Sequence, residues 1–311
     1  MHKYYIFYFL SNLKIYCILL LKVDFSRHLI YNKINNFLKE KNMKLDERMK
    51  KYEYVSRPYL MCKQPVIIRL DGRAFHSFTK GFKKPFDNIL IKTMQDTMNY
   101  LCENITNCKF GYTQSDEISL LLVDDSNTET QAWFDNNLSK LVSISASMAT
   151  LAFNKFFKSN VENAYLEDDK FDTLPYEEKF DTAIFDARAF NLPNHEVNNY
   201  FIWRQQDCVR NSIQMVGQAN FSHKQLQNKK CRDILEMLRE KGINYDKDFP
   251  IYLKHGTCAY KKYCSYNMIR KDANTGYIFT QEVTKNKWII DFNMPNLAIE
   301  NFFIKEKMLH D

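Results

Sequence analysis

The sequence predicts an α+β protein built on a split βαβ unit, the ferredoxin-like arrangement of strands and helices. Short apolar runs have the length and composition of buried strands. Two longer segments repeat apolar residues every three or four positions, as amphipathic helices do. These elements follow one another as strand, helix, strand, strand, helix and strand. With 311 residues, 45% of them hydrophobic, the chain can fill such a core and carry further elements.

The first strand, helix and hairpin are predicted between residues 66 and 123. Residues 66–70 form an apolar run that ends at Asp71-Gly72, a turn-forming pair. Asp87 is the expected N-cap of a helix, because its carboxylate can accept a free N–H of the first turn. The apolar stripe of this helix consists of Leu90, Met94, Met98, Leu101 and Ile105. Two hairpin strands are predicted over residues 109–112 and 118–123.

The later elements are a long helix, a fourth strand, a mainly helical region and a late pair of strands. They are predicted over residues 131–157, 183–186, 195–242, 277–283 and 287–292. Inside the helical region, Ser222 and Gln225 have the spacing of a capping box. Gly242 is the expected stop of the last helix of that region, which begins at Cys231.

The first 42 residues differ from the rest and are predicted to be an N-terminal extension. Residues 1–23 hold no acid and three lysines among apolar side chains. This composition is typical of a mitochondrial targeting segment; the alternative is a cytoplasmic protein whose translation starts at Met43. Each apolar half is shorter than the ~18 residues of a membrane span, so no membrane partner is expected. Residues 43–195 are the expected core, and residues 196–311 a mainly helical region packed on it.

The composition limits the kinds of partner and site that the protein is expected to have. There are 44 Lys and Arg against 37 Asp and Glu, a net charge of +7, which suits an anionic partner such as RNA, DNA or a nucleotide. The 8 cysteines include no Cys-x-x-Cys pair, so a zinc site or disulfide framework is not expected. With only 7 glycines, each is expected where a side chain would not fit.

Carboxylates from separate parts of the chain are expected to meet at one edge of the sheet. In a split βαβ unit, the strand that ends at Asp71 lies beside an arm of the hairpin that carries Asp116 and Glu117. Two carboxylates about 4 Å apart repel by about 4 kcal/mol at an effective dielectric constant near 20. Bound Mg²⁺ would remove this cost, since it prefers hard oxygen ligands and phosphates. The pattern therefore predicts two-metal phosphoryl or nucleotidyl transfer.

Each acid also has a simpler interpretation. Asp71 before Gly72 can be an ordinary turn former, and Asp116-Glu117 can be solvated hairpin acids. Their joint position on adjacent strands favours the metal site. Cationic and aromatic residues follow Asp71 in the run Arg69-Leu-Asp-Gly-Arg-Ala-Phe-His-Ser-Phe78. Three lysines then surround Gly81, where the backbone can approach phosphates closely.

Five motifs follow one another along the chain: Arg69-Leu-Asp-Gly-Arg-Ala-Phe-His76, Lys84-Pro-Phe-Asp87, Gly111-Tyr-Thr-Gln-Ser-Asp-Glu117, Phe185-Asp-Ala-Arg188 and Trp203-Arg-Gln-Gln-Asp-Cys208. Taken together, they resemble those of the tRNA-His guanylyltransferase family, the reverse polymerases that add nucleotides to the 5′ end of tRNA. The resemblance spans roughly residues 46–260 and combines several long motifs in the same order. It implies a domain akin to the palm of ordinary polymerases.

The resemblance implies roles for individual residues. Asp71 and Asp116 match metal-binding aspartates, Gly72 matches a residue that offers its carbonyl to Mg²⁺, and Glu117 matches a further catalytic acid. The implied nucleotide-binding residues are Arg73, Ala74, Phe75, His76, Lys84, Ser115 and Lys140. Asn137 stands where the family would place another basic residue.

The implied chemistry uses two Mg²⁺ ions and takes ATP and GTP or another NTP as substrates. A tRNA 5′-monophosphate is first adenylylated by ATP, and the 3′-hydroxyl of the incoming NTP then attacks the activated end. The family also implies a homotetramer. Basic residues that could follow the tRNA backbone are Arg188, Arg204, Arg210, Lys224 and Lys229, with solvated helix faces as the alternative for the lysines.

One departure from the family pattern concerns the substrate. Enzymes dedicated to tRNA-His carry His-Ile-Asn-Asn-Leu-Tyr after the Asp-Cys pair, whereas this chain has Val209-Arg-Asn-Ser-Ile-Gln214. This resembles the guanylyltransferase-like branch, which repairs 5′-truncated tRNAs by templated addition. The metal site is not affected by this difference.

Two other function classes share the predicted topology. A non-catalytic RNA-binding module would need aromatic residues on its central strands, and residues 109–112 offer a fragment of that pattern. However, the acids at 116 and 117 follow directly and would repel RNA. The other alternative is a nucleotide cyclase on the same palm.

Overall fold

The computed structural model describes residues 43–271 and 276–308. The chain divides into two compact units, Met1–Arg57 and Pro58–Asp311. Of the first unit, the structure describes the helix α2 (Leu45–Val55), and the predicted targeting segment lies outside the described residues. In the described part of the chain, no helix has both the length and the apolar character that a membrane crossing requires.

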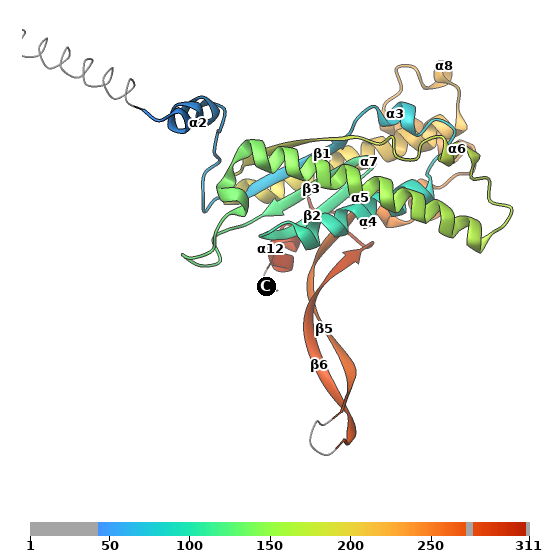
Figure 1. Cartoon of the computed structure of the whole chain (residues 1–311). Coiled ribbons are helices and arrows are strands. Elements are labelled where there is room, and N and C mark those ends of the chain that lie inside the picture. The colour runs from blue at the N-terminus through green and yellow to red at the C-terminus, as the bar shows by residue number, and fades with distance from the viewer. Residues whose placement is uncertain (1–42, 272–275, 309–311) are drawn as a thin grey trace, which may run out of the picture. The chain divides into compact units, whose positions relative to one another are not determined.

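The second unit is built on one antiparallel sheet of six strands in the order β4-β1-β3-β2-β5-β6 (Figure 1). The first four strands have the neighbour relations of a split βαβ unit, so the predicted α+β fold class is confirmed. The strands are β1 (Val66–Gly72), β2 (Cys108–Gln114), β3 (Glu117–Leu122), β4 (Phe185–Asn191), β5 (Thr257–Lys271) and β6 (Ile278–Asp291).

Both faces of the sheet are covered, which explains why the central strands are apolar without alternation. Ile68 packs in a cluster with α4 (Asn88–Asn104) and α5 (Leu138–Glu167). Its neighbour Ile67 faces the opposite cluster, which contains residues of α7 (Val197–Asn220). The shorter helices are α3 (Phe75–Phe78), η1 (Trp133–Asn136), α6 (Leu174–Glu177), η2 (Asn194–Glu196), α8 (His223–Leu226), α9 (Cys231–Glu240), α10 (Tyr245–Asp248), α11 (Ile251–His255) and α12 (Phe303–Met308).

Local capping signals in the sequence are confirmed. The Asp87 carboxylate accepts the backbone N–H of Leu90 at 3.0 Å and begins α4. The predicted capping box at Ser222 and Gln225 begins α8. Gly242 follows α9 with φ of +84°, a conformation that favours glycine.

Two predicted elements are wrong. The long helix begins at Leu138, capped by Asn137, rather than at residue 131, because Phe134 and Asp135 have positive φ and end the preceding turn. The predicted late strand pair over residues 277–283 and 287–292 is one continuous strand, β6. Its partner is β5, which the sequence patterns did not indicate.

Gly111 lies where a side chain would not fit, as the small number of glycines in the sequence led us to expect. A Cβ built there would lie 2.4 Å from Cys102 Sγ and 3.1 Å from Met98 Cγ, on the α4 side of the sheet. We expect Gly111→Ala to lower the free energy of unfolding by about 1–3 kcal/mol, because the core must shift to admit a methyl group. Urea unfolding measures this change. Adding Cys102→Ala should recover part of the loss, and a double variant no more stable than Gly111→Ala would contradict the steric explanation.

Candidate active site

Asp71, Gly72 and Asp116 lie together where the central strands β1 and β3 meet at one end of the sheet, called the carboxylate edge below. Asp71 pairs in register with Glu117, and the Gly72 N–H donates to the Asp116 carbonyl at 3.0 Å. Strand β1 runs through Gly72, so Asp71-Gly72 is the end of a strand rather than the predicted turn. The hairpin between β2 and β3 places Asp116 directly beside that end. Carboxylates that are distant in the sequence are thus neighbours in the fold.

The electrostatics of this edge favour a bound cation. Burial raises the pKa of the Asp71 carboxyl, and the carboxylate of Asp186, its register partner on β4, raises this pKa further, although nearby arginines oppose the shift. Burial also raises the pKa of Asp116, with Asp71 adding to the shift. The Asp116 carboxylate accepts one hydrogen bond from the Ser115 hydroxyl at 3.0 Å. Partly buried acids that repel one another are stabilised by a divalent ion.

The donor set fits Mg²⁺. In the described part of the chain, no three His, Cys, Asp or Glu side chains gather as a ligand cluster. A metal at this edge would therefore rely on two carboxylates, a backbone carbonyl, water and substrate phosphates, which is how Mg²⁺ is commonly held. The residues that would hold it are Asp71, Asp116 and Gly72.

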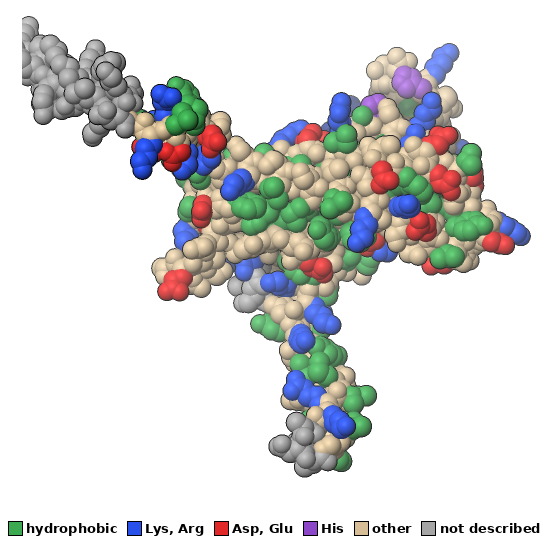
Figure 2. Space-filling view, in the orientation of Figure 1, with side chains coloured by type: hydrophobic (Ala, Val, Ile, Leu, Met, Phe, Trp, Pro, Cys, Tyr) green, Lys and Arg blue, Asp and Glu red, His purple; other side chains and the backbone are tan. Residues whose placement is uncertain are grey.

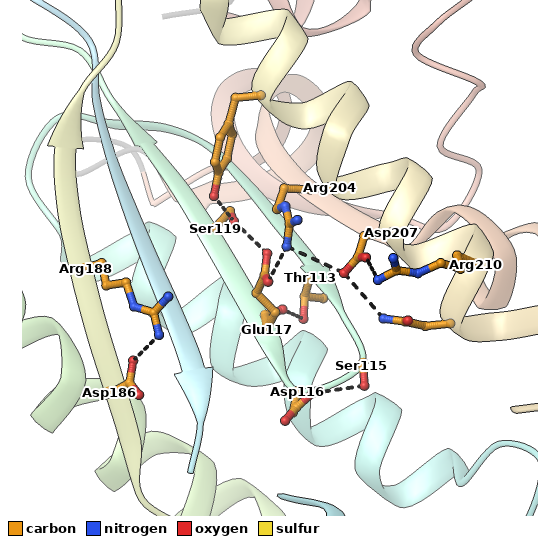
Figure 3. A network of polar contacts seen from close by, with 12 residues as sticks. Thr113, Ser115, Asp116, Glu117, Ser119, Asp186, Arg188, Arg204, Asp207 and Arg210 are labelled. Atoms are coloured by element: carbon orange, nitrogen blue, oxygen red, sulfur yellow. Dashed lines mark hydrogen bonds and ion pairs between the residues drawn. The ribbon is translucent and has the colours of Figure 1, made fainter. Parts of the chain in front are cut away.

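Glu117 lies on the same face of the sheet as Asp71, its register partner, and its side chain points toward α7 (Figure 3). Its carboxylate accepts a hydrogen bond from Arg204 on α7 at 2.8 Å, and the two side chains are only 9% and 6% exposed. Burial raises the pKa of Glu117, while Arg204 opposes this shift. The predicted catalytic acid is therefore a buried ion-pair partner in this structure.

Arg204, which was predicted to contact tRNA, is likewise buried inside the protein. Its guanidinium lies 3.5 Å from the centre of the Trp203 ring and 3.7 Å from the Asp207 carboxylate. Asp207 also pairs with the exposed Arg210. The sequence motif from 203 to 208 thus encodes a polar network that joins α7 to the sheet (Figure 3).

Most predicted nucleotide-binding residues lie in the segments that flank the carboxylate edge. Arg73, Ala74, His76, Lys84 and Ser115 are exposed. Ala74 has φ of +55° and begins α3, so the chain turns sharply directly after β1.

Two predicted nucleotide contacts are not at this edge. The Phe75 ring is buried, stacks on Phe78 and contacts Phe153 and Phe185, so its side chain is part of the core. Lys140 is exposed in the first turn of α5, next to the residues that precede β1. That turn is at the opposite end of β1 from Asp71, so Lys140 does not reach the carboxylates of its own chain.

A partly open pocket lies beside Ser115. Apolar residues of α4 and α11 form much of its wall, including Leu90, Ile91 and Leu253. Its polar lining includes Gln114, whose buried Oε1 has no hydrogen-bond partner in the described structure. The other polar lining residues are Asp87, Gln95, Thr113, Ser115, Asn211, Ser212, Tyr252 and Thr257.

The sequence reasoning missed this pocket because its walls come from four separate segments. Its lining residues from the recognised motifs are Phe86, Asp87, Thr113, Gln114, Ser115, Cys208, Asn211 and Ser212, and no single motif indicated that they meet. An apolar lining with a few polar groups is typical of small-ligand sites.

The remaining basic residues predicted to bind tRNA are exposed but scattered. Arg188 on β4 is 3.8 Å from Asp186, close to the carboxylate edge. Arg210 lies on α7, Lys224 on α8 and Lys229 before α9. Figure 2 shows Lys and Arg side chains near α8 at the end of the molecule where α3 and α6 also lie.

A split βαβ sheet with paired aspartates at a strand end is the arrangement of a polymerase palm-type catalytic core. A family model described as Thg1, tRNAHis guanylyltransferase, matches residues 46–193. The tRNA(His) guanylyltransferase of Schizosaccharomyces pombe is 31% identical over 222 residues, which cover 67% of this chain and 77% of the relative. An uncharacterised protein of Acanthamoeba polyphaga mimivirus is 27% identical over 280 residues, 84% of this chain and 91% of that protein.

A solved structure supports the same assignment. A bacterial tRNA(His) guanylyltransferase-like protein in complex with ATP aligns with a TM-score of 0.69 and 38% identity, covering 86% of this chain and all of that chain. The chain belongs to the tRNAHis guanylyltransferase family, and it is a tRNA nucleotidyltransferase.

Proposed function

We propose that this protein adds nucleotides to the 5′ end of tRNA in the 3′–5′ direction, with Mg²⁺, through an adenylylated 5′ end. The observation that carries the proposal is the meeting of Asp71 and Asp116 at a sheet edge beside an open pocket with apolar walls and a few polar groups. Bacterial relatives solved in complex with ATP and with GTP support the use of nucleoside triphosphates.

Two displacements at phosphorus make up the proposed reaction. An oxygen of the tRNA 5′-monophosphate attacks the α-phosphorus of ATP, and pyrophosphate leaves. The 3′-hydroxyl of an incoming NTP then attacks the 5′ phosphorus of the tRNA, and AMP leaves. Asp71, Asp116 and the Gly72 carbonyl would hold Mg²⁺. The ion would make that hydroxyl more acidic and would neutralise charge on the leaving groups.

The exposed residues around the edge position the substrates in this proposal. Arg73, His76 and Lys84 offer donors to the phosphates, with Lys84 acting as a mobile point charge. Ser115 lies between Asp116 and the pocket, so a triphosphate at the carboxylates can place its base among the pocket residues. The unpaired Oε1 of Gln114 would accept a hydrogen bond from an N–H of that base.

We favour the branch that repairs 5′-truncated tRNAs over strict selection of tRNA-His. The family's histidine-containing motif is replaced by residues 209–214, and two of these, Asn211 and Ser212, line the pocket. A site with neutral, adaptable polar groups suits templated addition of different nucleotides. Guanylyl addition to tRNA-His is the alternative specificity.

The deciding experiment incubates the full chain with labelled NTPs, Mg²⁺ and a 5′-truncated tRNA whose template base is varied. Extension of the tRNA by the complementary nucleotide supports templated repair, and addition of G to tRNA-His alone supports the alternative. A cyclic nucleotide product would identify a cyclase. Binding of tRNA without any product would identify a non-catalytic RNA-binding protein and would refute the proposal.

Lys84 provides a sharper test of the nucleotide site. We expect Lys84→Ala to raise the KM for NTP by about 10–100-fold, because a hydrogen bond from a charged group to phosphate is lost. The dissociation constant for tRNA should change less than twofold. Lys80→Ala, which removes another exposed lysine of the same segment, is the control. Equal losses of NTP and tRNA binding would contradict a phosphate contact.

Compartment and assembly are further parts of the proposal. We expect a mitochondrial protein, and a cytoplasmic one if translation starts at Met43; fluorescence of a C-terminal fusion distinguishes the two. We also expect a homotetramer, which light scattering of the purified protein measures.

A further inference from the structure

Trp203 is a large aromatic residue that the fold leaves at the surface close to the carboxylate edge. It lies on α7 and is 51% exposed, whereas Tyr200 and Arg204 on the same helix are buried. Arg204, the next residue, donates a hydrogen bond to Glu117, which is the register partner of Asp71. The indole ring is therefore available to a substrate that comes to these carboxylates.

Two neighbours hold the indole ring in a fixed position. The guanidinium of Arg204 lies 3.5 Å from the ring centre and covers one of its faces. The Tyr200 ring makes a T-shaped contact with it, with the ring centres 5.9 Å apart. Both neighbours are themselves anchored, Tyr200 by a 2.8 Å hydrogen bond to Ser119 and Arg204 by its ion pair with Glu117. Because one face is covered and half of the residue is exposed, the open area lies mostly on the other face.

The face of the sheet beside Trp203 is open near the carboxylates. Asp186 pairs with Asp71, so Asp186 and its second neighbour Arg188 lie on the same face of the sheet as Asp71. Their side chains are 57% and 55% exposed, so α7 leaves this end of β4 uncovered in the described structure. Phe190, farther along the same strand and on the same face, does pack on α7. Trp203 thus lies where the helix-covered part of this face gives way to an open part.

A nucleotide matches the chemistry of this open area. Its base can stack on the free face of the indole ring, and Arg188 can donate hydrogen bonds to its phosphate. A protein partner fits less well, because a protein interface needs a broader apolar centre. The exposed residues one turn before and one turn after Trp203, Asn199 and Gln206, are polar.

We propose that the open face of Trp203 stacks on the base of the 5′-terminal nucleotide of the tRNA and so positions its 5′ phosphate at the carboxylate edge. The assignment rests on the proposed function, which brings this phosphate to Asp71 and Asp116. Stacking accepts every base, because each base has a π-face, and this suits truncated tRNAs whose first nucleotide varies. The base of a free NTP fits less well here, since the pocket beside Ser115 offers it polar partners.

The test places the fluorescent base 2-aminopurine at the first nucleotide of a 5′-truncated tRNA, because stacking on an aromatic ring quenches its emission. Trp203→Leu removes the ring, and Trp203→Phe keeps an aromatic face. Tyr165→Leu is the matched control, because Tyr165 is 50% exposed and lies on α5, which packs on the opposite face of the sheet. A second tRNA carries the probe at an internal position of the acceptor stem.

We expect the unmodified protein, Trp203→Phe and Tyr165→Leu to quench the terminal probe, and Trp203→Leu to lose at least about half of this quenching. The internal probe should respond alike in all four proteins. Trp203→Leu should lower kcat/KM for the truncated tRNA by about 5–100-fold, as expected for one lost base stack, with the KM for NTP changed less than about twofold. Trp203→Phe should recover most of this loss.

Three results would overturn the proposal. The first is a terminal probe that the unmodified protein does not quench, or that Trp203→Leu quenches equally well. The second is a rise in the KM for NTP without a change for tRNA, which would assign the ring to the free nucleotide. The third is an equal loss of activity and of melting temperature in Trp203→Leu and Trp203→Phe, which would show that the ring only packs on Arg204.

The outcome can be separated from that of the proposed reaction. If Trp203 quenches the terminal probe but no nucleotide is added, the proposed reaction fails and the stacking contact stands. If nucleotides are added while the terminal probe is unquenched, the stacking contact fails and the reaction stands.

Discussion

An Asp116→Asn variant is expected to lose nucleotide addition to truncated tRNA by about 10³-fold or more, because one of the two carboxylates at the sheet edge becomes neutral. The amide has nearly the shape of the carboxylate, so the hairpin should fold normally. Without Mg²⁺, the variant should be as stable as the unmodified protein or slightly more stable, since repulsion from Asp71 is removed. Single-turnover assays and thermal unfolding measure the two effects.

Mg²⁺ binding can be followed independently of activity. The melting temperature of the unmodified protein should rise with Mg²⁺ concentration, because the ion binds only the folded state. Asp116→Asn should lose this rise. Asp125→Asn is the control, because that acid is exposed on the loop that follows β3, at the other end of the strand from Asp116. Nucleotide addition by Asp116→Asn within tenfold of the unmodified protein would refute the metal assignment.

The second large effect is expected from Arg204→Met, which should lower the free energy of unfolding by about 3–5 kcal/mol. The substitution leaves the Glu117 carboxylate buried without its cation, and it removes the 2.8 Å hydrogen bond. Glu117→Gln should cost less, because the amide oxygen still accepts from Arg204 and Asp207 remains 3.7 Å from the guanidinium. Urea unfolding gives both values.

A double variant distinguishes a structural ion pair from a catalytic acid. Arg204→Met/Glu117→Met should be more stable than Arg204→Met alone, because no buried charge is left unpaired. If Glu117→Gln instead keeps full stability and loses nucleotide addition by more than about 10²-fold, Glu117 acts in the chemistry. The description of Glu117 as an ion-pair partner would then be incomplete.

The fold was predictable where burial of an element leaves a recognisable pattern of apolar residues in the sequence. Strands β1 and β3 are buried on both faces and appear as apolar runs, and α4 shows its stripe of apolar residues. The ends of β5 and β6 that extend beyond the sheet (Figure 1) were not predictable in this way, because no face of them packs on a core and their sequence has no consistent alternation. The start of α5 was misplaced because the positive φ values of residues 134 and 135 have no glycine to signal them.

The site residues that lie at the ends of neighbouring strands were predictable from the sequence. Asp71 and Asp116 follow from the topology, since the split βαβ order makes their strands neighbours. The orientation of Glu117 required the exact strand start, because a shift of one residue reverses the face. The burial of Arg204 depends on a partner 87 positions away in the sequence, and nothing in the local pattern of α7 distinguishes it from an exposed arginine.

One consequence concerns communication across the molecule. Arg210, Asp207, Arg204 and Glu117 form a continuous series of ion pairs that begins at the surface and ends one residue from Asp116. An incoming polyanion that attracts Arg210 would leave Asp207 with Arg204 alone, and the charge balance beside the hairpin would change. The charge on the outer surface of α7 is thus connected through ion pairs to the hairpin that carries Asp116.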